Sequence, residues 1–423
     1  MLKKNELDKI VIIYLVLLGV LGQIVDIVLK SGNPKSMLCL FFMALYLCYY
    51  LKNLSFQKID ILPVAMFIVF LHGNQYIIDG NNYGIIRCAF ILFFVIVSRK
   101  RTEWATLFLK YAIPAYLVHI FATIWLKFDS FSYHNFILPL FPDDRESLTA
   151  MYQHGQMAGI SNHYSTNGMY LACGLILFFA LWIHTDNYRK KRRYLFCLFL
   201  AVIAVLLTGK RAHALFSLTA IYVVYCGFSA NRQRGKWFKM FCVLVGGVAF
   251  VYIGQLMFPN LFTFISRFKD TVAQGDISLG RFETWATAWL LFKQNPIFGI
   301  GWRRFYELSS VYGAYDFNLN PHNVYIQLLC ETGIVGAVIY FSWFIGIYIK
   351  TVKLYTRLRK EGSVSQNDER CIAFSFGMQT FFLLYCITGN PLYDAPTFIP
   401  YFVACAMTLS YQYKYKNRKT ESR

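Results

Sequence analysis

The residues best suited to chemistry are two arginines and a histidine in the more polar stretches of a very apolar sequence. Arg211 follows the turn LTGK, Arg281 opens the segment GRFETW, and His322 stands in the tripeptide PHN. Paired guanidinium groups bind phosphate oxygens in a bidentate manner, without a metal. A histidine, with an ordinary pKa of about 6.5, can accept the proton of a hydroxyl group. These residue types therefore suit transfer of a group from a phosphorylated donor to a hydroxyl acceptor.

Further cations could extend an anion-binding pocket around these three residues. Lys210 is adjacent to Arg211, while Arg303 and Arg304 lie in a loop rich in aromatic residues. The three could hold phosphate oxygens, but arginines beside such a loop could equally grip lipid headgroups. Lys210 and Arg211 could also snorkel towards headgroups.

Two polar residues are candidates for binding the remainder of a substrate. Asn323 follows His322, and His163 belongs to the run GISNHYSTNG, whose hydroxyl, amide and imidazole groups suit hydroxyl-rich ligands. An ordinary solvated loop is the alternative interpretation of that run. Arg87 and Lys110 are weaker candidates inside apolar segments, where a cation is expected to face the bundle interior, a polar cavity or an interface.

A short helix is predicted to position Arg281. Trp285, Ala288, Trp289 and Phe292 recur at the spacing of an amphipathic helix with one aromatic face, which would lie on a membrane or on other helices. Asn295-Pro296 ends this helix. The following GIG motif predicts a tight turn, because glycine permits positive φ.

The composition places the whole chain in the membrane class. Of its 423 residues, 57% are hydrophobic and 15% charged, and the mean hydropathy is +0.42. Twelve apolar segments of near-spanning length are predicted to be transmembrane helices. They lie at roughly 10–29, 36–51, 60–78, 83–98, 105–126, 168–184, 194–208, 212–229, 237–258, 333–349, 371–389 and 397–411. The first lacks a small-x-small cleavage site, so we interpret it as a retained span and not as a signal peptide.

These segments divide the chain into three regions. Residues 1–258 contain transmembrane helices 1–9, with an outside loop at about 127–167. Residues 259–332 form an extracytoplasmic catalytic loop with short helices. Residues 333–423 contain helices 10–12 and a cytoplasmic tail.

The charge distribution predicts the orientation. Most of the 42 lysines and arginines fall on one side if both termini are cytoplasmic, as the positive-inside rule requires. The net charge of +20 is therefore interpreted as a topology signal with attraction to anionic membrane lipid, and no nucleic-acid partner is expected. Lys210 and Arg211 are cations on the outer side, against this rule, which favours a functional role.

Several other classes of chemistry have no support in the sequence. The eleven cysteines lie almost entirely in apolar segments, without a C-x-x-C pair or metal-ligand spacing. The sequence lacks a Walker loop, a dinucleotide fingerprint and an H-E-x-x-H helix. We therefore expect no cofactor and no metal site.

The order LTGKR, GRFETW, NPIFGIGW and PHNVYIQLLCETGIVG resembles the O-antigen polymerase and O-antigen ligase superfamily, most clearly from Leu207 to Gly336. The resemblance implies an all-α protein of the bacterial inner membrane with about twelve transmembrane helices. It implies that Arg211 and Arg281 hold the pyrophosphate of a lipid-linked sugar donor and that His322 is catalytic. It also implies a glycosyltransferase that needs no cofactor.

We predict polymerisation of polyprenyl-pyrophosphate-linked oligosaccharide repeat units, with undecaprenyl as the lipid, into capsule, exopolysaccharide or O-antigen. The TGKR form of the turn resembles polymerases more than ligases. An O-antigen ligase acting on the lipid A core is the alternative within the superfamily. A polyprenyl-linked glycan flippase is the alternative of another class, although its substrate groups should lie near the bilayer midplane. A non-catalytic scaffold is a third. Other polysaccharide-assembly membrane proteins are expected as further partners.

Overall fold

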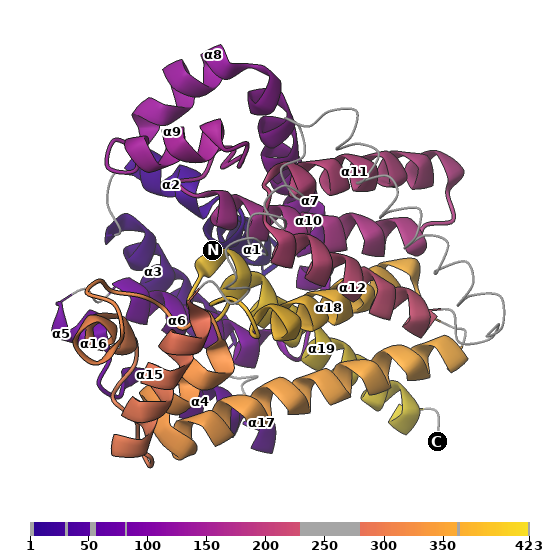
Figure 1. Cartoon of the computed structure of the whole chain (residues 1–423). Coiled ribbons are helices and arrows are strands. Elements are labelled where there is room, and N and C mark those ends of the chain that lie inside the picture. Colours follow the sequence, from indigo (N-terminus) through magenta and orange to yellow (C-terminus); the bar gives the residue numbers. More distant parts are fainter. Residues whose placement is uncertain are drawn as a thin grey trace.

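The computed structural model describes residues 4–29, 33–50, 56–80, 83–228, 280–361 and 364–421, and these contain helices and no strand (Figure 1). The all-helical prediction is confirmed for this part of the chain. The longer helices are α1 (Lys4–Gly19), α3 (Asn33–Tyr50), α6 (Tyr83–Ser98), α7 (Glu103–Phe128), α10 (Tyr164–Ile183), α11 (Tyr188–Leu207), α12 (Arg211–Phe228), α15 (Arg281–Gln294), α17 (Val324–Glu361), α18 (Gln366–Tyr385) and α19 (Ala395–Glu421). The shorter ones are α2 (Gly22–Leu29), α4 (Ile61–Leu71), α5 (Gln75–Ile78), α8 (Ser130–Ser132), α9 (Arg145–Gln153) and α16 (Phe305–Tyr312), with single turns η2 (Lys58–Asp60), η3 (Tyr133–Ile137) and η4 (Leu138–Leu140).

Among the described residues, three helices are long and apolar enough to cross a membrane by themselves: Glu103–Phe128, Tyr164–Ile183 and Val324–Leu358. The bent pair α1 and α2 would make a fourth. The count of twelve spans is therefore not established. The predicted span 237–258, and the loop from 259 to 279, lie outside the described residues.

The predicted first span is broken where a continuous helix was expected. Helices α1 and α2 meet at an angle of 90°. At the bend, the carbonyl oxygen of Val20 is 2.7 Å from Nε2 of the buried His119 in α7. A backbone group that leaves the helix ladder in an apolar interior needs such a partner. The bend depends on a residue about a hundred positions away, so local hydropathy does not predict it.

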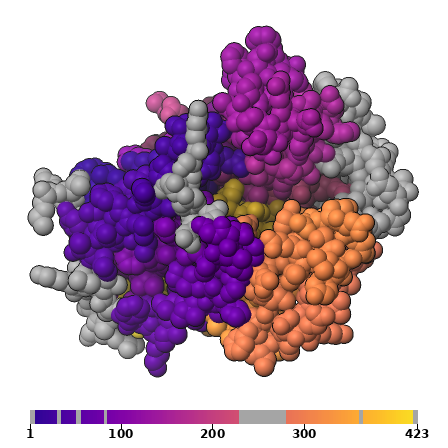
Figure 2. Space-filling model, turned by 90° about the vertical axis from the view of Figure 1, so that its left-hand side faces the viewer, coloured from indigo at the N-terminus to yellow at the C-terminus, as the bar shows by residue number. Residues whose placement is uncertain are grey.

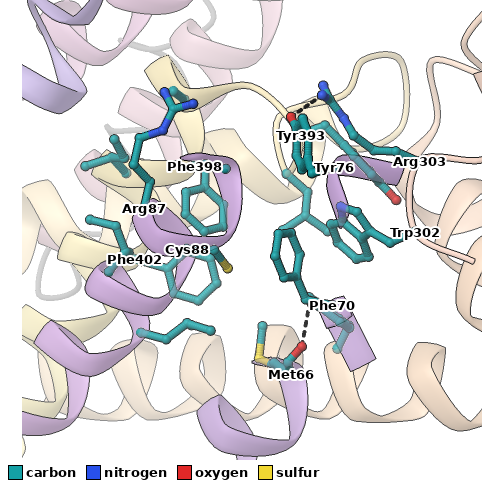
Figure 3. A pocket seen from close by; sticks show the side chains of 17 residues that line it. Met66, Phe70, Tyr76, Arg87, Cys88, Trp302, Arg303, Tyr393, Phe398 and Phe402 are labelled. Atoms are coloured by element: carbon teal, nitrogen blue, oxygen red, sulfur yellow. Dashed lines mark hydrogen bonds between the residues drawn. The ribbon is translucent and has the colours of Figure 1, made fainter. Parts of the chain in front are cut away.

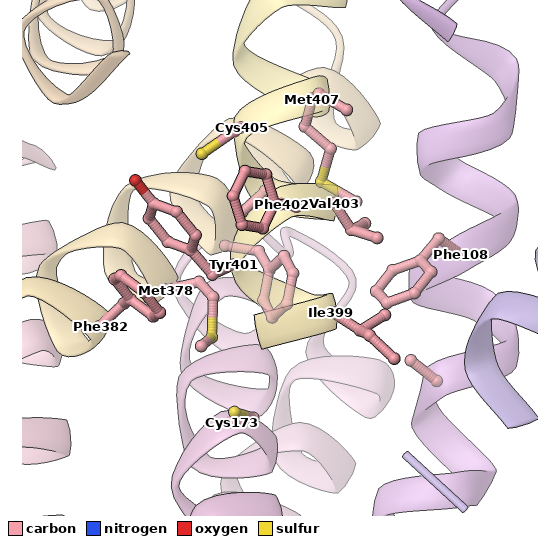
Figure 4. Close-up of a cluster of buried hydrophobic side chains, with 14 of the residues drawn as sticks. Phe108, Cys173, Met378, Phe382, Ile399, Tyr401, Phe402, Val403, Cys405 and Met407 are labelled. Atoms are coloured by element: carbon pink, nitrogen blue, oxygen red, sulfur yellow. The ribbon is translucent and has the colours of Figure 1, made fainter. Parts of the chain in front are cut away.

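The core lies where α7, α10, α18 and α19 meet (Figure 4). Phe108, Cys173 and Met378 are fully buried there, and the rings of Tyr401 and Phe382 stack with centroids 3.7 Å apart. Helices in lipid associate mainly through van der Waals packing, because lipid tails are as apolar as the helices. Most of the described cysteines are likewise buried, consistent with their interpretation as small apolar fillers.

Helix α15 begins at Arg281 and ends at Gln294, just before Asn295-Pro296, as predicted. Its packing face differs from the prediction. Thr284, Thr287, Ala288 and Leu291 are the buried residues, whereas Trp289 is 49% exposed. Small side chains let α15 approach α17 closely, so the aromatic side chains lie at the rim and on the outer surface. That surface continues at the exposed Ile297 and Phe298.

The turn after α15 is held against a break in α17. Gly333 interrupts the helical backbone of α17 with φ 63° and ψ −169°. Across the break, the amide nitrogens of Ile334 and Val335 donate to the carbonyls of Pro296 and Ile297, at 2.9 and 3.2 Å. The turn thus replaces the hydrogen bonds that α17 loses. This docking ties the Arg281 helix to the helix that follows His322.

Gly299 leaves no room for a side chain in this contact, which predicts a clear stability effect. It has φ +72°, and an added Cβ would lie 2.4 Å from the carbonyl carbon of Glu331. We expect Gly299→Ala to lower the apparent Tm by several degrees, because both the backbone conformation and the contact become strained. Gly346→Ala in α17 is the matched control, since its Cβ meets nothing within 4 Å. Equal melting of the two purified variants would contradict the role of this turn.

Candidate active site

A hollow opens on one side of the molecule. Figure 2 shows the surface recessed between the magenta lobe around α8 and α9, the orange lobe of α15 and α16, and the indigo N-terminal region. Surface from the yellow C-terminal part of the chain is visible inside this hollow. Helix α15 begins with Arg281, and Asp394 directly precedes α19.

His322 is held in place by its neighbours in the chain. The carbonyl oxygen of Pro321 accepts a hydrogen bond of 2.7 Å from Nε1 of Trp285 in α15. Asn323 caps α17, with its side-chain oxygen accepting from the backbone amides of Tyr325 and Ile326 at 3.0 and 3.2 Å. His322 itself has a positive φ of 48°, an unusual conformation that recurs at functional sites. The Asn323 oxygen is therefore used in capping α17.

Most of the residues predicted from the sequence converge on His322. Lys210, Arg281 and His163 lie close enough to His322 to change its pKa electrostatically. Arg211, at the start of α12, acts in the same way on Arg281. The loop before α10, the turn between α11 and α12, the start of α15 and the start of α17 therefore meet at one place. We call these five residues the cationic cluster.

The two histidines of the cluster are neutral near pH 7. Burial lowers the pKa of the His322 imidazole to about 4, and the positive charges of Lys210 and Arg281 act in the same direction. The ring is nevertheless open to solvent, as expected for a side chain in a hollow. His163 caps α10 by accepting at Nδ1 from the amide of Ser165 (3.0 Å). Its pKa is also lowered to about 4, chiefly by burial and then by Lys210.

The arginines of the cluster are half-buried. Burial lowers the pKa of Arg281, the hydroxyl of Tyr385 raises it, and the charge of Arg211 lowers it again. Guanidinium groups remain charged at any physiological pH. Two guanidinium groups that repel one another, with Lys210 nearby, form a strong site for an anion with several oxygens.

Arg303 and Arg304 are not part of the cationic cluster. The Arg303 guanidinium donates to the hydroxyl of Tyr76 and lies 4.7 Å over the Tyr76 ring, while its amide donates to Glu331 Oε2 at 2.9 Å. Arg304 is exposed and reaches back only to the carbonyl of Ile300, at 3.5 Å. Neighbouring arginines in the sequence thus have different surroundings, and nothing in the described part of the chain places Arg304 at the site.

Asp394 belongs to the site but was missed by sequence reasoning. Burial raises the pKa of its carboxyl group to about 6, against the opposing charges of Arg303 and Lys210. A signal was available, because Asp394 is the only acidic residue between the last two predicted spans, on the outer side. Tyr164, which belongs to the run GISNHYSTNG that the sequence singled out, lies near the cluster. Its ring lies 5.4 Å from Nζ of Lys210.

Arg87 and Lys110, the two cations inside apolar segments, lie in different surroundings. Arg87 in α6 lines an internal cavity. Lys110 in α7 is exposed, with Nζ 5.8 Å from the ring of Tyr111. Neither residue is among the charged groups that act on His322.

Fold and site together define a helical membrane protein with a cationic, histidine-containing centre at the ends of its helices. Residues 195–341 match the family model described as O-antigen ligase, and no curated protein matches the sequence. This match supports the predicted resemblance to the O-antigen polymerase and ligase superfamily, which is confirmed over this region of the chain. The matched region includes Arg211, Arg281 and His322. The family implies a membrane glycosyltransferase-like enzyme and a lipid-linked oligosaccharide substrate.

Proposed function

We propose that this protein polymerises polyprenyl-pyrophosphate-linked oligosaccharide repeat units into a surface polysaccharide. The observation that carries the proposal is the convergence of Lys210 and Arg281 on a histidine that is neutral near pH 7, with Arg211 acting on Arg281. An anionic leaving group and a base are the two things that glycosyl transfer from such a donor requires. The cationic cluster contains residues for both.

In the proposed reaction, a hydroxyl oxygen of the acceptor glycan attacks the anomeric carbon of the donor. The bond between that carbon and the pyrophosphate oxygen breaks, and polyprenyl pyrophosphate leaves with the electron pair. Arg211, Arg281 and Lys210 stabilise the negative charge on this leaving group. His322 accepts the hydroxyl proton and later releases it to solvent. A single displacement inverts the anomeric centre.

The position of the cluster supports an enzyme over a flippase. A transporter is expected to bind its substrate near the bilayer midplane. The residues proposed here lie at helix starts and in connections between helices, as Arg211 and Arg281 illustrate. A scaffold, the third alternative, would have no need for converging cations beside a neutral histidine.

Reconstitution tests the proposed function directly. The purified protein is incorporated into liposomes with a lipid-linked repeat unit and no nucleotide, and the products are separated on a gel. We expect a ladder of lengthened glycans. Transfer onto lipid A core without a ladder would instead establish the ligase. No joined glycan with either acceptor would exclude both reactions.

We further propose a bacterial plasma-membrane location with both termini in the cytoplasm and the 259–332 loop outside. The excess of Lys and Arg on the cytoplasmic side of the predicted topology supports this orientation. Single cysteines at Ser310 and Ser363, in a cysteine-free background, are expected to react with an impermeant thiol reagent only at Ser310 in intact cells. Reaction at both positions would contradict the topology.

The lowered pKa of His322 predicts an unusual pH profile. The base must be neutral, so kcat/KM, which reports the free enzyme, should fall only as the pH approaches about 4. Bound pyrophosphate offsets the charges of Lys210 and Arg281, which raises the pKa of His322 in the complex. The acid limb of kcat should therefore lie at higher pH than that of kcat/KM. Initial rates over a pH series measure both, and coincident limbs would contradict this coupling.

A further inference from the structure

An apolar cavity with arginines at its mouth lies beside the cationic cluster. The cavity has a volume of about 160 Å³ and lies between α4, α6, α17 and α19 and the start of the loop after α15. Its apolar walls include Met66, Phe70, Cys88, Trp302, Phe398 and Phe402. Figure 3 shows the Arg87 and Arg303 side chains at the same end of this cavity, on either side of Tyr393.

Arg303 is positioned by the protein, and a second cation lies near Arg87. Arg303 is held by its hydrogen bond to Tyr76, drawn as a dashed line in Figure 3, and by the bond from its amide to Glu331. The positive charge of Arg87 repels that of Lys35 in α3, a buried cation that is ion-paired with Asp26. The mouth of the cavity therefore has positive potential directly above apolar walls.

We propose that this cavity is a second lipid-phosphate site, which holds the first isoprene unit of a polyprenyl phosphate with its phosphate group between Arg87 and Arg303. The choice of a polyprenyl lipid rests on the proposed function. The volume is close to that of a cavity that accommodates benzene, about 150 Å³, so one five-carbon unit fits and a whole chain does not. The remaining isoprene units would run along the lipid-facing surface.

The arrangement favours a polyprenyl phosphate over a phospholipid. In a polyprenyl phosphate, the hydrocarbon begins at the phosphate oxygen, so an anion and an apolar group are adjacent. A phospholipid separates its phosphate from its acyl chains by glycerol and two esters. Those polar groups would lie against Phe398 and Phe402 with their hydrogen bonds lost, which is unfavourable. The spacing of arginines directly above aromatic walls therefore matches the first lipid.

The cavity and the cationic cluster are neighbours with separate cations. Asp394 follows the cavity residue Tyr393, and the charges of both Arg303 and Lys210 act to lower the pKa of its carboxyl group. A carboxylate between the two groups separates two anion sites. One lipid phosphate at each would place donor and acceptor side by side, as polymerisation requires, whereas a ligase needs a single polyprenyl-linked substrate. The site at Arg87 and Arg303 thus serves the second lipid-linked substrate.

Photolabelling tests this site without requiring catalysis. A farnesyl monophosphate with a benzophenone on its chain is irradiated with the purified protein in nanodiscs, and the labelled peptides are identified by mass spectrometry. We expect labels on α6 and α19. Arg87→Gln and Arg303→Gln should each reduce them about tenfold, because a charge-assisted hydrogen bond is lost. Ala395→Trp, which fills the cavity and keeps both arginines, should also reduce them.

The controls distinguish this proposal from the catalytic one. Lys110→Gln removes an exposed cation from an apolar segment outside the cavity and should leave labelling unchanged. His322→Ala should also leave it unchanged, so an inactive enzyme can still support the second site. Labelling that survives both arginine changes would overturn the proposal. Competition by phosphatidylglycerol as effective as that by polyprenyl phosphate would assign the cavity to a phospholipid and overturn it as well.

Discussion

Replacing His322 by alanine is expected to lower the rate of glycan transfer by about 10²- to 10⁴-fold, the usual contribution of a general base. His322 is neutral, exposed and near the cations Lys210 and Arg281, so its imidazole can accept a proton beside the leaving group. Binding of the donor should persist, because the arginines supply it. Single-turnover transfer and donor binding, measured on the same preparation, separate the two effects.

The backbone at His322 requires a second variant. With φ 48° the position suits asparagine better than alanine, because asparagine tolerates the left-handed region. His322→Asn should therefore fold like the parent protein and remain as inactive as His322→Ala. His134→Ala is the matched control, since His134 is an exposed histidine bonded only locally, to the carbonyl of Ser130. Parental rates in both His322 variants would remove the residue from the mechanism.

Replacing Arg211 or Arg281 by alanine is expected to weaken use of the donor by about 10- to 100-fold each, as for loss of a hydrogen bond to a charged group. Both arginines belong to the cationic cluster, and the charge of Arg211 lowers the pKa of Arg281. The loss should appear in KM for the donor as well as in kcat, because pyrophosphate is bound before and during transfer. Lysine at either position should restore donor use only in part, since lysine lacks the planar fork of hydrogen-bond donors that arginine has.

Arg304→Ala provides the control for this pair. Arg304 is exposed, lies in the same predicted loop (259–332) as Arg281 and is not among the groups that act on His322 or Arg281. Its removal changes the net charge by the same amount as the Arg281 change. Transfer should remain at the parental level. Equal losses in Arg304→Ala and Arg281→Ala would show that overall charge, and not the cluster, determines donor use.

The sequence by itself determined the class of protein and the chemical groups of the candidate active site. Apolar composition and long apolar segments predict helices, because a helix satisfies its own backbone groups in a bilayer interior. The ends of α15 follow from local rules, with Gly280 before Arg281 and Asn295-Pro296 after Gln294. The residue types at positions 211, 281 and 322 already indicated phosphate binding and proton transfer.

The boundary of α17 shows where local patterns fail. The apolar pattern predicted a span from 333, but the helix begins at Val324. Hydropathy excludes Gln327 and Glu331 from a span, yet both are buried, because Gln327 Nε2 and the Tyr393 hydroxyl donate to the two oxygens of Glu331 at 2.9 and 2.8 Å. Tyr393 is distant in the chain, so only the tertiary structure satisfies this carboxylate.

Tertiary structure also decided which cations act together. Arg303 and Arg304 are identical in type and adjacent in sequence, but one lies at a cavity and the other in solvent. Asp394 carries no recognisable motif and becomes part of the site only because the connection before α19 lies beside Lys210 and Arg303. Electrostatic coupling depends on distance through space and on burial, whereas sequence patterns report only separation along the chain.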